Sequence, residues 1–461
     1  MTVDTVIAGG RLVTPTDVSA GSIAIDDGTI VAVGHERSLP EADRRIDATG
    51  RLVMPGVVDP HVHIDEMPEN RAGTMPAETG AAALGGMTTF VDFAWQGRDR
   101  AGTDEDAGLL EGIEHKRSKE DQSYVDYSLH GVLSRETEET LDAIPDAVAA
   151  GVTSFKMFMS TYPVGVSNGF VDRAFERVAA EDAVATMHTE DPSVCEHLAD
   201  RLKREGKGDP VYYPDSRPDY AEAMAADDVA RMARETGVKY YGIHTSCRDA
   251  AEVLSGFQED GSNIRAETCT HYTALTREIH ESRGNLPLIA PPLRSDDDVE
   301  AMFEHLRDGT LSVVSTDHSV YHREYKENVE NWWDSPFGAN SAQYSLPVFH
   351  EVAVNRRGFS YPFLVRVLST NPARTFGFPD KGTLEPGTDA DIVVFDPDET
   401  WTIDESENES NSTFSLYDGR EVTGAVKQTL VRGQLVADEG EVVAEPGTGR
   451  FVERDLPDWS E

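Results

Sequence analysis

Six residues with metal-binding side chains stand at or beside the ends of separate apolar runs: His61, His63, Lys156, His188, His244 and Asp317. Imidazole nitrogens and carboxylate oxygens are suitable ligands for zinc and similar divalent ions. Side chains two residues apart in an extended strand point the same way, so His61 and His63 can bind one ion together. A single His-x-His pair is common by chance. The presence of this pair together with further donors at other strand ends predicts a metal site.

Lys156 is unusual because it lies inside the apolar run TSFKMFM. An unpaired ammonium is costly to bury. The residue could be salt-bridged, or it could extend its charged end to solvent. A buried lysine can also lose its proton, and the neutral amine can then add carbon dioxide to form a carbamate whose two oxygens bridge two cations.

Eight β-rich apolar runs alternate with stretches of helical composition, which is typical of repeated βα units and a parallel sheet. Eight strands favour a closed (β/α)8 TIM barrel, in which the strand ends carrying these donors converge on one mouth. An open doubly wound sheet is the alternative. The runs are LVMPGVVD before His61, Thr88 to Ala94, Tyr127 to Leu133, Val152 to Met159, Ala183 to His188, Lys239 to His244, Ile264 to Cys269 and Leu311 to Asp317.

Both ends of the chain have a different pattern. Short apolar runs separated by turn signals fill the first 50 residues and return near the C-terminus, as in GTDADIVVFD and GEVVAE, which predicts strands and hairpins. We expect the two segments to form one small β-sandwich domain. The predicted division is 1–54 and 376–461 for this domain and 55–375 for the barrel, with the polar run 405–412 as a surface loop.

The composition limits the possible partners and surroundings. With 84 acidic and 41 basic residues, the net charge of −43 makes nucleic acid an improbable partner. The acidic excess is spread along the chain, as on the solvated surfaces of halophilic proteins. The chain has no signal-peptide pattern and no apolar run of ~20 residues, so we expect a cytoplasmic protein without membrane contact. The three cysteines, Cys195, Cys247 and Cys269, lack the spacing of a thiolate zinc site and are predicted to be buried apolar residues.

Several segments of the chain resemble the hydantoinase and dihydropyrimidinase family of the amidohydrolase superfamily. The resemblance extends over nearly the whole chain and is most specific at FKMFM and in the order His-x-His, Lys, His, His, Asp. The segments are VMPGVVDPHVHIDEMP, GVTSFKMFM, HTED, GIHTS, STDHS, LSTNPARTFGFPDKGTLEPGTDADIVVFD and PGTGRFVERD.

The resemblance implies a (β/α)8 barrel beside a β-sandwich, with two zinc ions bridged by carboxylated Lys156. It places His61, His63 and Asp317 on one ion. It places His188 and His244 on the other. The implied reaction is ring opening of a hydantoin or dihydropyrimidine to an N-carbamoyl amino acid. A metal-bridging hydroxide would attack the carbonyl, one ion would polarise its oxygen, and Asp317 would carry the proton to the leaving nitrogen.

The resemblance also implies some substrate contacts. Relatives have an oxyanion-contacting tyrosine five residues after the lysine; here that position is Thr161, and Tyr162 follows it. Tyr162 could preserve the contact or could simply be packed. Ala290 in LIAPPLR and Asn340 in GAN resemble substrate-contacting segments.

Other functions remain open at this point. His271 falls where relatives differ in substrate contacts and is otherwise a structural histidine. An anionic substrate would need an arginine near the mouth, for which Arg71 and Arg294 are candidates. Allantoinase and dihydroorotase activities are the alternatives, and a non-catalytic scaffold relative is a further one, which the complete ligand set disfavours. Relatives are commonly homo-oligomers, so we expect a homotetramer or homodimer.

Overall fold

The computed structural model describes residues 2–64, 72–97, 107–161 and 163–460. Its centre is a barrel of eight parallel strands, each paired with the next along the chain. The strands are β6 (Val57–Asp59), β8 (Met87–Ala94), β9 (Asp126–Val132), β10 (Ser154–Met159), β11 (Val184–Thr189), β12 (Lys239–Gly242), β13 (Ile264–Cys269) and β14 (Val313–Ser315). The predicted (β/α)8 fold is confirmed.

Two very short strands complete the ring at its mouth. β7 (Val62–His63) pairs in parallel with β15 (His318–Ser319), with His318 opposite Val62 and Ser319 opposite His63. The first and last parts of the barrel are therefore joined beside the residues predicted to bind metal. The backbone N–H of Thr316 adds a 3.4 Å hydrogen bond to Asp59 Oδ1 across the same seam.

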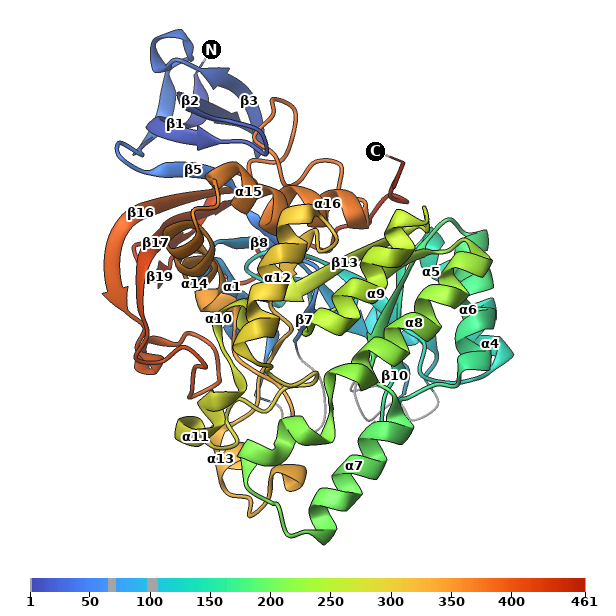
Figure 1. Cartoon of the computed structure of the whole chain (residues 1–461). Helices are drawn as coiled ribbons and strands as arrows, with labels where there is room; N and C mark the ends of the chain where they lie inside the picture. The colour runs from blue at the N-terminus through green and yellow to red at the C-terminus, as the bar shows by residue number, and fades with distance from the viewer. Residues whose placement is uncertain (1, 65–71, 98–106, 162, 461) are drawn as a thin grey trace.

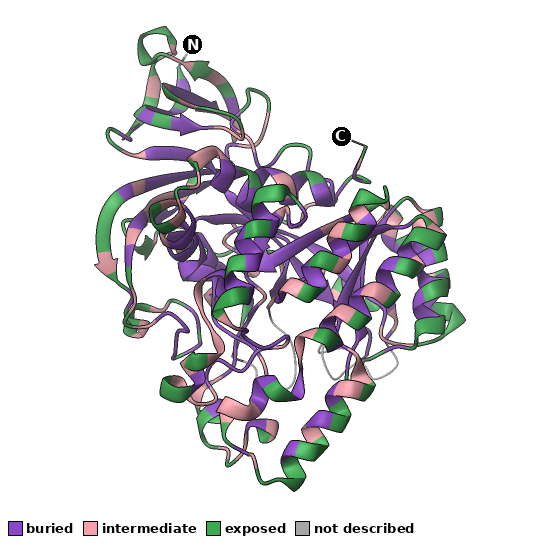
Figure 2. Cartoon of the chain, in the orientation of Figure 1, coloured by how far each residue is buried: buried purple, intermediate pink, exposed green. Residues whose placement is uncertain are grey.

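Helices cover the outside of the barrel and turn their exposed faces to solvent (Figures 1 and 2). Barrel strands are buried on both faces, as in other parallel sheets that helices cover. The helices are α1 (Met75–Leu84), α3 (Leu109–Arg117), α4 (Glu138–Asp142), α5 (Ile144–Ala149), α6 (Asn168–Ala180), α7 (Pro192–Arg204), α8 (Asp219–Thr236), α9 (Arg248–Glu259), α10 (Thr270–Ala274), α11 (His280–Arg283), α12 (Asp296–Asp308), α13 (Arg323–Glu327), α14 (Ser345–Phe349), α15 (Tyr361–Val365) and α16 (Asn371–Phe376).

Strands from both chain ends form a separate sheet beside the barrel (Figure 1). Its order is β19-β18-β17-β16-β5-β1-β2-β3, with β4 paired to β1. A small β domain built from both termini is therefore present, as predicted. Its strands are β1 (Val3–Val13), β2 (Val18–Asp26), β3 (Thr29–Gly34), β4 (Ala42–Asp47), β5 (Leu52–Pro55), β16 (Ile392–Thr402), β17 (Glu421–Val431), β18 (Gln434–Asp438) and β19 (Glu441–Val442).

One predicted strand is corrected by the structure. The run LVMPGVVD contains two strands, β5 in the β domain and β6 in the barrel. The change of sheet occurs at Gly56, where an added Cβ would lie 2.0 Å from Thr88 Oγ1. Only glycine lets the chain pass so close to β8, and periodicity alone could not reveal this crossing.

A buried ion cluster joins the β domain to the barrel. Lys381 Nζ lies 2.7 Å from Asp126 at the start of β9, 2.9 Å from Asp389 and 2.6 Å from Asp391 just before β16. The side chain of Lys381 is only 2% exposed. The ammonium compensates three neighbouring carboxylates that would otherwise repel one another.

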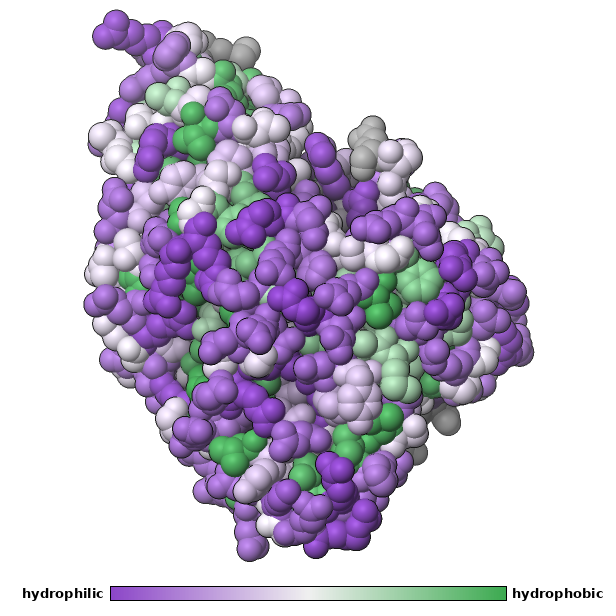
Figure 3. All heavy atoms as spheres, in the orientation of Figure 1, coloured by the Kyte–Doolittle hydropathy of each residue, from purple (hydrophilic) through white to green (hydrophobic). Residues whose placement is uncertain are grey.

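The visible surface is mostly hydrophilic, with small scattered apolar areas (Figure 3). Among the described residues, no helix is both long and apolar enough to cross a membrane.

Candidate metal centre

The six predicted metal ligands line a single cavity of about 210 Å³ at the mouth of the barrel. His188 lies near the end of β11, and His61, His244 and Asp317 follow β6, β12 and β14 by two residues, whereas Lys156 lies within β10 and His63 in β7. Side chains at the C-terminal ends of the strands converge in a parallel barrel. The remaining lining residues are Phe158, Ala290, Ser319, Tyr321, Pro336, Phe337 and Gly338.

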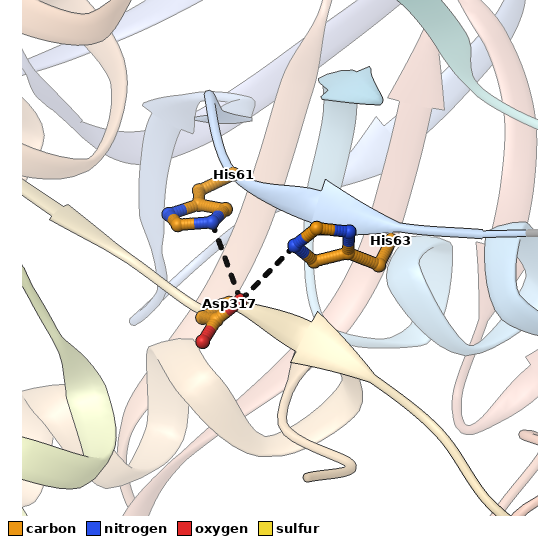
Figure 4. Close-up of side chains that lie close together, drawn as sticks. All are labelled: His61, His63 and Asp317. Carbon is orange, nitrogen blue, oxygen red and sulfur yellow. Dashed lines mark ion pairs between the residues drawn. The ribbon is translucent and has the colours of Figure 1, made fainter. Parts of the chain in front are cut away.

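His61, His63 and Asp317 form the first group of donors (Figure 4). Asp317 Oδ1 lies 3.3 Å from His61 Nε2 and 3.4 Å from His63 Nε2. One donor atom from each residue falls within 4.8 Å of the others. Two imidazoles and one carboxylate at this spacing can surround a divalent ion.

His188 and His244 form the second group. His188 Nδ1 and His244 Nε2 lie 2.9 Å apart, and both side chains are buried. Their rings meet nearly edge to face, with centroids 4.7 Å apart. The ring centroids of His61 and His244 are 5.3 Å apart, so the two groups are neighbours.

Lys156 belongs to the same cavity and is 1% exposed. Its Nζ lies 4.6 Å from the ring centroid of Phe158 and 5.4 Å from that of Phe93. Burial lowers the pKa values of His61, His188 and His244, and the nearby Lys156 lowers each of them further. Since a metal ligand must be a neutral imidazole, these shifts keep the three histidines in the required form.

Two of the predicted ligands have an uncommon backbone conformation. His244 has φ of 39° and Asp317 has φ of 46°, both in the left-handed region. Such residues are a small minority of non-glycine positions and cluster at functional sites. In both cases the strand has just ended, and the left-handed turn accompanies a side chain that lines the cavity.

Carboxylates that the sequence analysis missed contact the histidines. Glu267 Oε1 lies 2.7 Å from His61 Nδ1, while its Oε2 accepts a 2.8 Å hydrogen bond from the hydroxyl of Tyr241. Glu190 Oε2 lies 2.9 Å from His188 Nε2. An acidic residue inside the predicted strand IRAETC was an available signal for Glu267, because such strands are normally apolar.

The residues predicted to contact substrate differ in where the structure places them. Ala290 lines the cavity. Asn340 is fully buried, donates from Nδ2 to the carbonyl of Phe414 at 3.3 Å, and does not belong to the described lining. That part of the wall consists of Pro336, Phe337 and Gly338 instead. Tyr162 and Arg71 lie outside the described residues.

The structure also gives the neighbours of three other residues considered from the sequence, Thr161, Arg294 and His271. Thr161 Oγ1 accepts a 3.2 Å hydrogen bond from Arg217 Nη2. Arg294 is buried and paired with Glu222 at 2.8 Å and Asp219 at 2.9 Å. These pairs occupy the guanidinium, and Arg294 is not part of the described lining. Burial lowers the pKa of His271 to about 4, and its ring packs against Tyr272.

The donor set fits two divalent ions. Within the described residues, His61 Nε2 and His244 Nδ1 are buried without a hydrogen-bond partner. Uncompensated buried nitrogens are rare, and bound ions are one of their explanations. Lys156 lines the same cavity as both histidine groups.

Comparison with known proteins agrees with this arrangement. Residues 52–436 match the model of the amidohydrolase family. The chain is 33% identical to a D-hydantoinase of Ralstonia pickettii, covering 98% of this chain and 99% of the relative. It is also 33% identical to an L-hydantoinase of Paenarthrobacter aurescens, covering 98% of each.

Solved structures show the same architecture. The dihydropyrimidinase from Brevibacillus agri superposes with a TM-score of 0.93 at 28% identity, covering 98% of this chain and 99% of that chain. The family model, the full-length relatives and the solved structures agree with one another, and the chain belongs to the hydantoinase and dihydropyrimidinase family of amidohydrolases.

Proposed function

We propose that the protein opens a neutral cyclic amide, a hydantoin or a dihydropyrimidine, by hydrolysis to an N-carbamoyl amino acid. The observation that carries this proposal is the convergence of all six predicted ligands on one cavity. Family membership narrows the reaction to hydrolysis of a carbon–nitrogen bond other than a peptide bond.

The cavity would hold two divalent ions, most simply zinc. His61, His63 and Asp317 would bind one ion, His188 and His244 the other, and carboxylated Lys156 would bridge them. When bound, such a pair of ions activates water, which is a poor nucleophile, and polarises the amide carbonyl, which is a poor electrophile.

Asp317 is suited to move the proton. Its side chain is 13% exposed, whereas that of His61 is 1% exposed, so Asp317 borders both the donors and the open part of the cavity. Its carboxylate can accept the proton that water loses and deliver it to the departing ring nitrogen. A carboxylate that serves both steps need not exchange with solvent between them.

The described lining favours a neutral substrate. Apart from the histidines, Lys156 is the only basic residue among the lining residues that the structure describes, and carboxylation would remove its positive charge. A substrate carboxylate would therefore find no basic side chain among the described lining residues to pair with it. Phe158, Tyr321 and Phe337 instead offer flat apolar surfaces to a planar ring.

We further propose a salt-adapted cytoplasmic enzyme that forms a homotetramer or homodimer. The charge of −43 supports the salt adaptation. The assembly and location rest on the family resemblance and on the sequence pattern described above. Size-exclusion chromatography with light scattering in high salt tests the assembly.

The deciding experiment combines metal analysis with ring-opening assays on protein purified in high salt. We expect about two zinc equivalents per chain and turnover of dihydrouracil or hydantoin. Turnover of allantoin alone, or of dihydroorotate alone, would replace the proposed substrate class. Protein without metal and without activity would contradict the proposed function altogether.

A further inference from the structure

Glu190 lies at the junction between a metal-binding strand and the next helix. β11 ends at Thr189, Glu190 follows it, and Asp191 caps α7 by accepting from the backbone N–H of Val194 at 2.8 Å. The backbone N–H of Glu190 also donates to the carbonyl of Met159 on β10 at 3.0 Å. The backbone at Glu190 is therefore held both by β10 and by the start of α7.

The carboxylate of Glu190 has two cationic or hydrogen-donating neighbours. Oε2 lies 2.9 Å from His188 Nε2 and also contacts Arg217 Nη1. Glu190 and Arg217 are 1% and 6% exposed. A buried carboxylate is stabilised in its charged form by such a paired guanidinium, and charge-assisted hydrogen bonds of this kind are short and directional.

We propose that Glu190 is a positioning residue that orients His188 toward the second metal ion, with Arg217 holding Glu190 in place. This inference rests on the binuclear site of the proposed function. It concerns how the chain presents one ligand, which the ligand set alone does not specify.

The nitrogen with which His188 can bind an ion depends on which of its two ring nitrogens carries the proton. Glu190 as a carboxylate can only accept, so His188 Nε2 must donate. The neutral ring then has its lone pair on Nδ1, the atom that faces His244 Nε2 at 2.9 Å. Glu190 thus selects the tautomer whose free lone pair points to the position of the ion.

His244 provides an internal contrast. Its Nδ1 is buried with no hydrogen-bond partner among the described residues, so no carboxylate orients its ring from that side. His61 resembles His188 instead, because Glu267 faces its Nδ1 at 2.7 Å. Each metal position therefore has one histidine held by a glutamate, Glu267 for the first ion and Glu190 for the second.

Arg217 links this contact to the cavity wall. Its guanidinium carbon lies 5.5 Å from the ring centroid of Phe337, a lining residue, and Nη2 donates to Thr161 Oγ1 at 3.2 Å. A shift of Arg217 would consequently move the acceptor of His188 and a wall of the substrate cavity together.

The test compares Glu190→Gln and Glu190→Met with Glu222→Gln. Glu222 is a matched control because it is also a buried glutamate paired with a buried arginine, Arg294, at 2.8 Å, but it contacts none of the six proposed ligands. Zinc stoichiometry and affinity are measured by titration against a chelator, and cobalt-substituted protein is followed by visible absorption. Circular dichroism and thermal melting confirm folding.

We expect Glu190→Met to weaken the second ion by about 10- to 100-fold and leave the first ion bound. Glu190→Gln keeps an acceptor and a similar size, so its loss should be smaller. Glu222→Gln should bind both ions like the wild type. If Glu190→Met does not fold, the comparison of Glu190→Gln with Glu222→Gln decides the question.

Three outcomes would contradict the proposal. Folded Glu190 variants that hold both ions with wild-type affinity would overturn the inference alone. An equal loss in Glu222→Gln would do the same, because it would indicate general loosening. Wild-type protein that binds no metal would overturn the proposed function, and this inference with it.

Discussion

Asp317 Oδ1 lies 3.3 Å from His61 Nε2, although the two residues come from the last and first strands of the barrel. The same oxygen lies 3.4 Å from His63 Nε2. One carboxylate oxygen thus faces both histidines of the His-x-His pair. A substitution at Asp317 alone replaces this carboxylate and keeps both histidines in the chain.

Asp317→Asn should lower kcat for ring opening by roughly 10²- to 10⁴-fold, because a carboxamide cannot accept the proton. Asparagine tolerates the left-handed backbone found at this position, so the fold should persist. Steady-state kinetics with circular dichroism check this. Activity within tenfold of the wild type would rule out Asp317 as the proton carrier.

Lys156→Met should abolish ring opening and reduce the bound metal below two ions per chain, because no carbamate can form. Wild-type protein prepared with ¹³C-labelled bicarbonate should show a carbamate carbon resonance that the variant lacks. Lys116→Met is the comparison, since Lys116 is another buried lysine and is paired with Asp92 at 2.7 Å. A labelled signal in Lys156→Met that equals the wild type would contradict carboxylation of Lys156.

Acid should destabilise the fold through His280. Burial lowers the pKa of His280 to about 4, whereas an unfolded histidine titrates near 6.5. Between these values the unfolded chain binds a proton that the folded chain does not, so stability is full above about pH 6.5 and falls toward pH 4. The difference corresponds to about 3 kcal/mol.

Urea unfolding of the wild type and His280→Gln at several pH values tests this. The variant should become relatively more stable as the pH falls from 6.5 to 4, while the two proteins keep a constant difference above pH 7. His197→Gln, at an exposed position on α7, should follow the wild type. Parallel curves for the wild type and His280→Gln would refute the assignment.

Lys381→Met should destabilise the fold by about 3–5 kcal/mol, because it leaves Asp126, Asp389 and Asp391 without their shared cation. The free energy of unfolding in urea measures the loss. Arg45→Met removes an exposed ion pair with Glu36 and should change stability little. Similar values for both variants would show that the cluster contributes no more than a surface pair.

The melting temperature should rise when potassium chloride increases from about 0.1 M to 1 M. The screening length falls from ~10 Å to ~3 Å over this range, which weakens the repulsion of the −43 charge. Sucrose serves as the uncharged comparison. A melting temperature independent of potassium chloride would contradict the proposed salt adaptation.

The sequence predicted the barrel because its strands and helices have periodic signals, and the six candidate ligands line one cavity. The run at Ile264 to Cys269 coincides with β13, and the other barrel runs differ from their strands by a few residues. Strand ends converge in this fold, so donors placed at those ends had to meet.

Contacts made through loops were less predictable. The local motif predicts Asn340 as a substrate contact, whereas the described lining of the cavity contains Phe337, three residues earlier. The position of this loop depends on packing between distant segments, such as the 5.1 Å approach of the Phe337 and Tyr213 rings. The left-handed φ of His244 could not be predicted either, because a histidine in the sequence does not indicate that conformation, whereas a glycine often does.

The pairing of β7 with β15 has a consequence for the order of events in the cell. Because Asp317 directly precedes β15, the His61 and His63 pair lacks its carboxylate partner until more than two thirds of the chain has left the ribosome. A shorter nascent chain can expose histidines but cannot close the ring around an ion. This seam of the barrel can therefore close only after the last barrel strand has been synthesised.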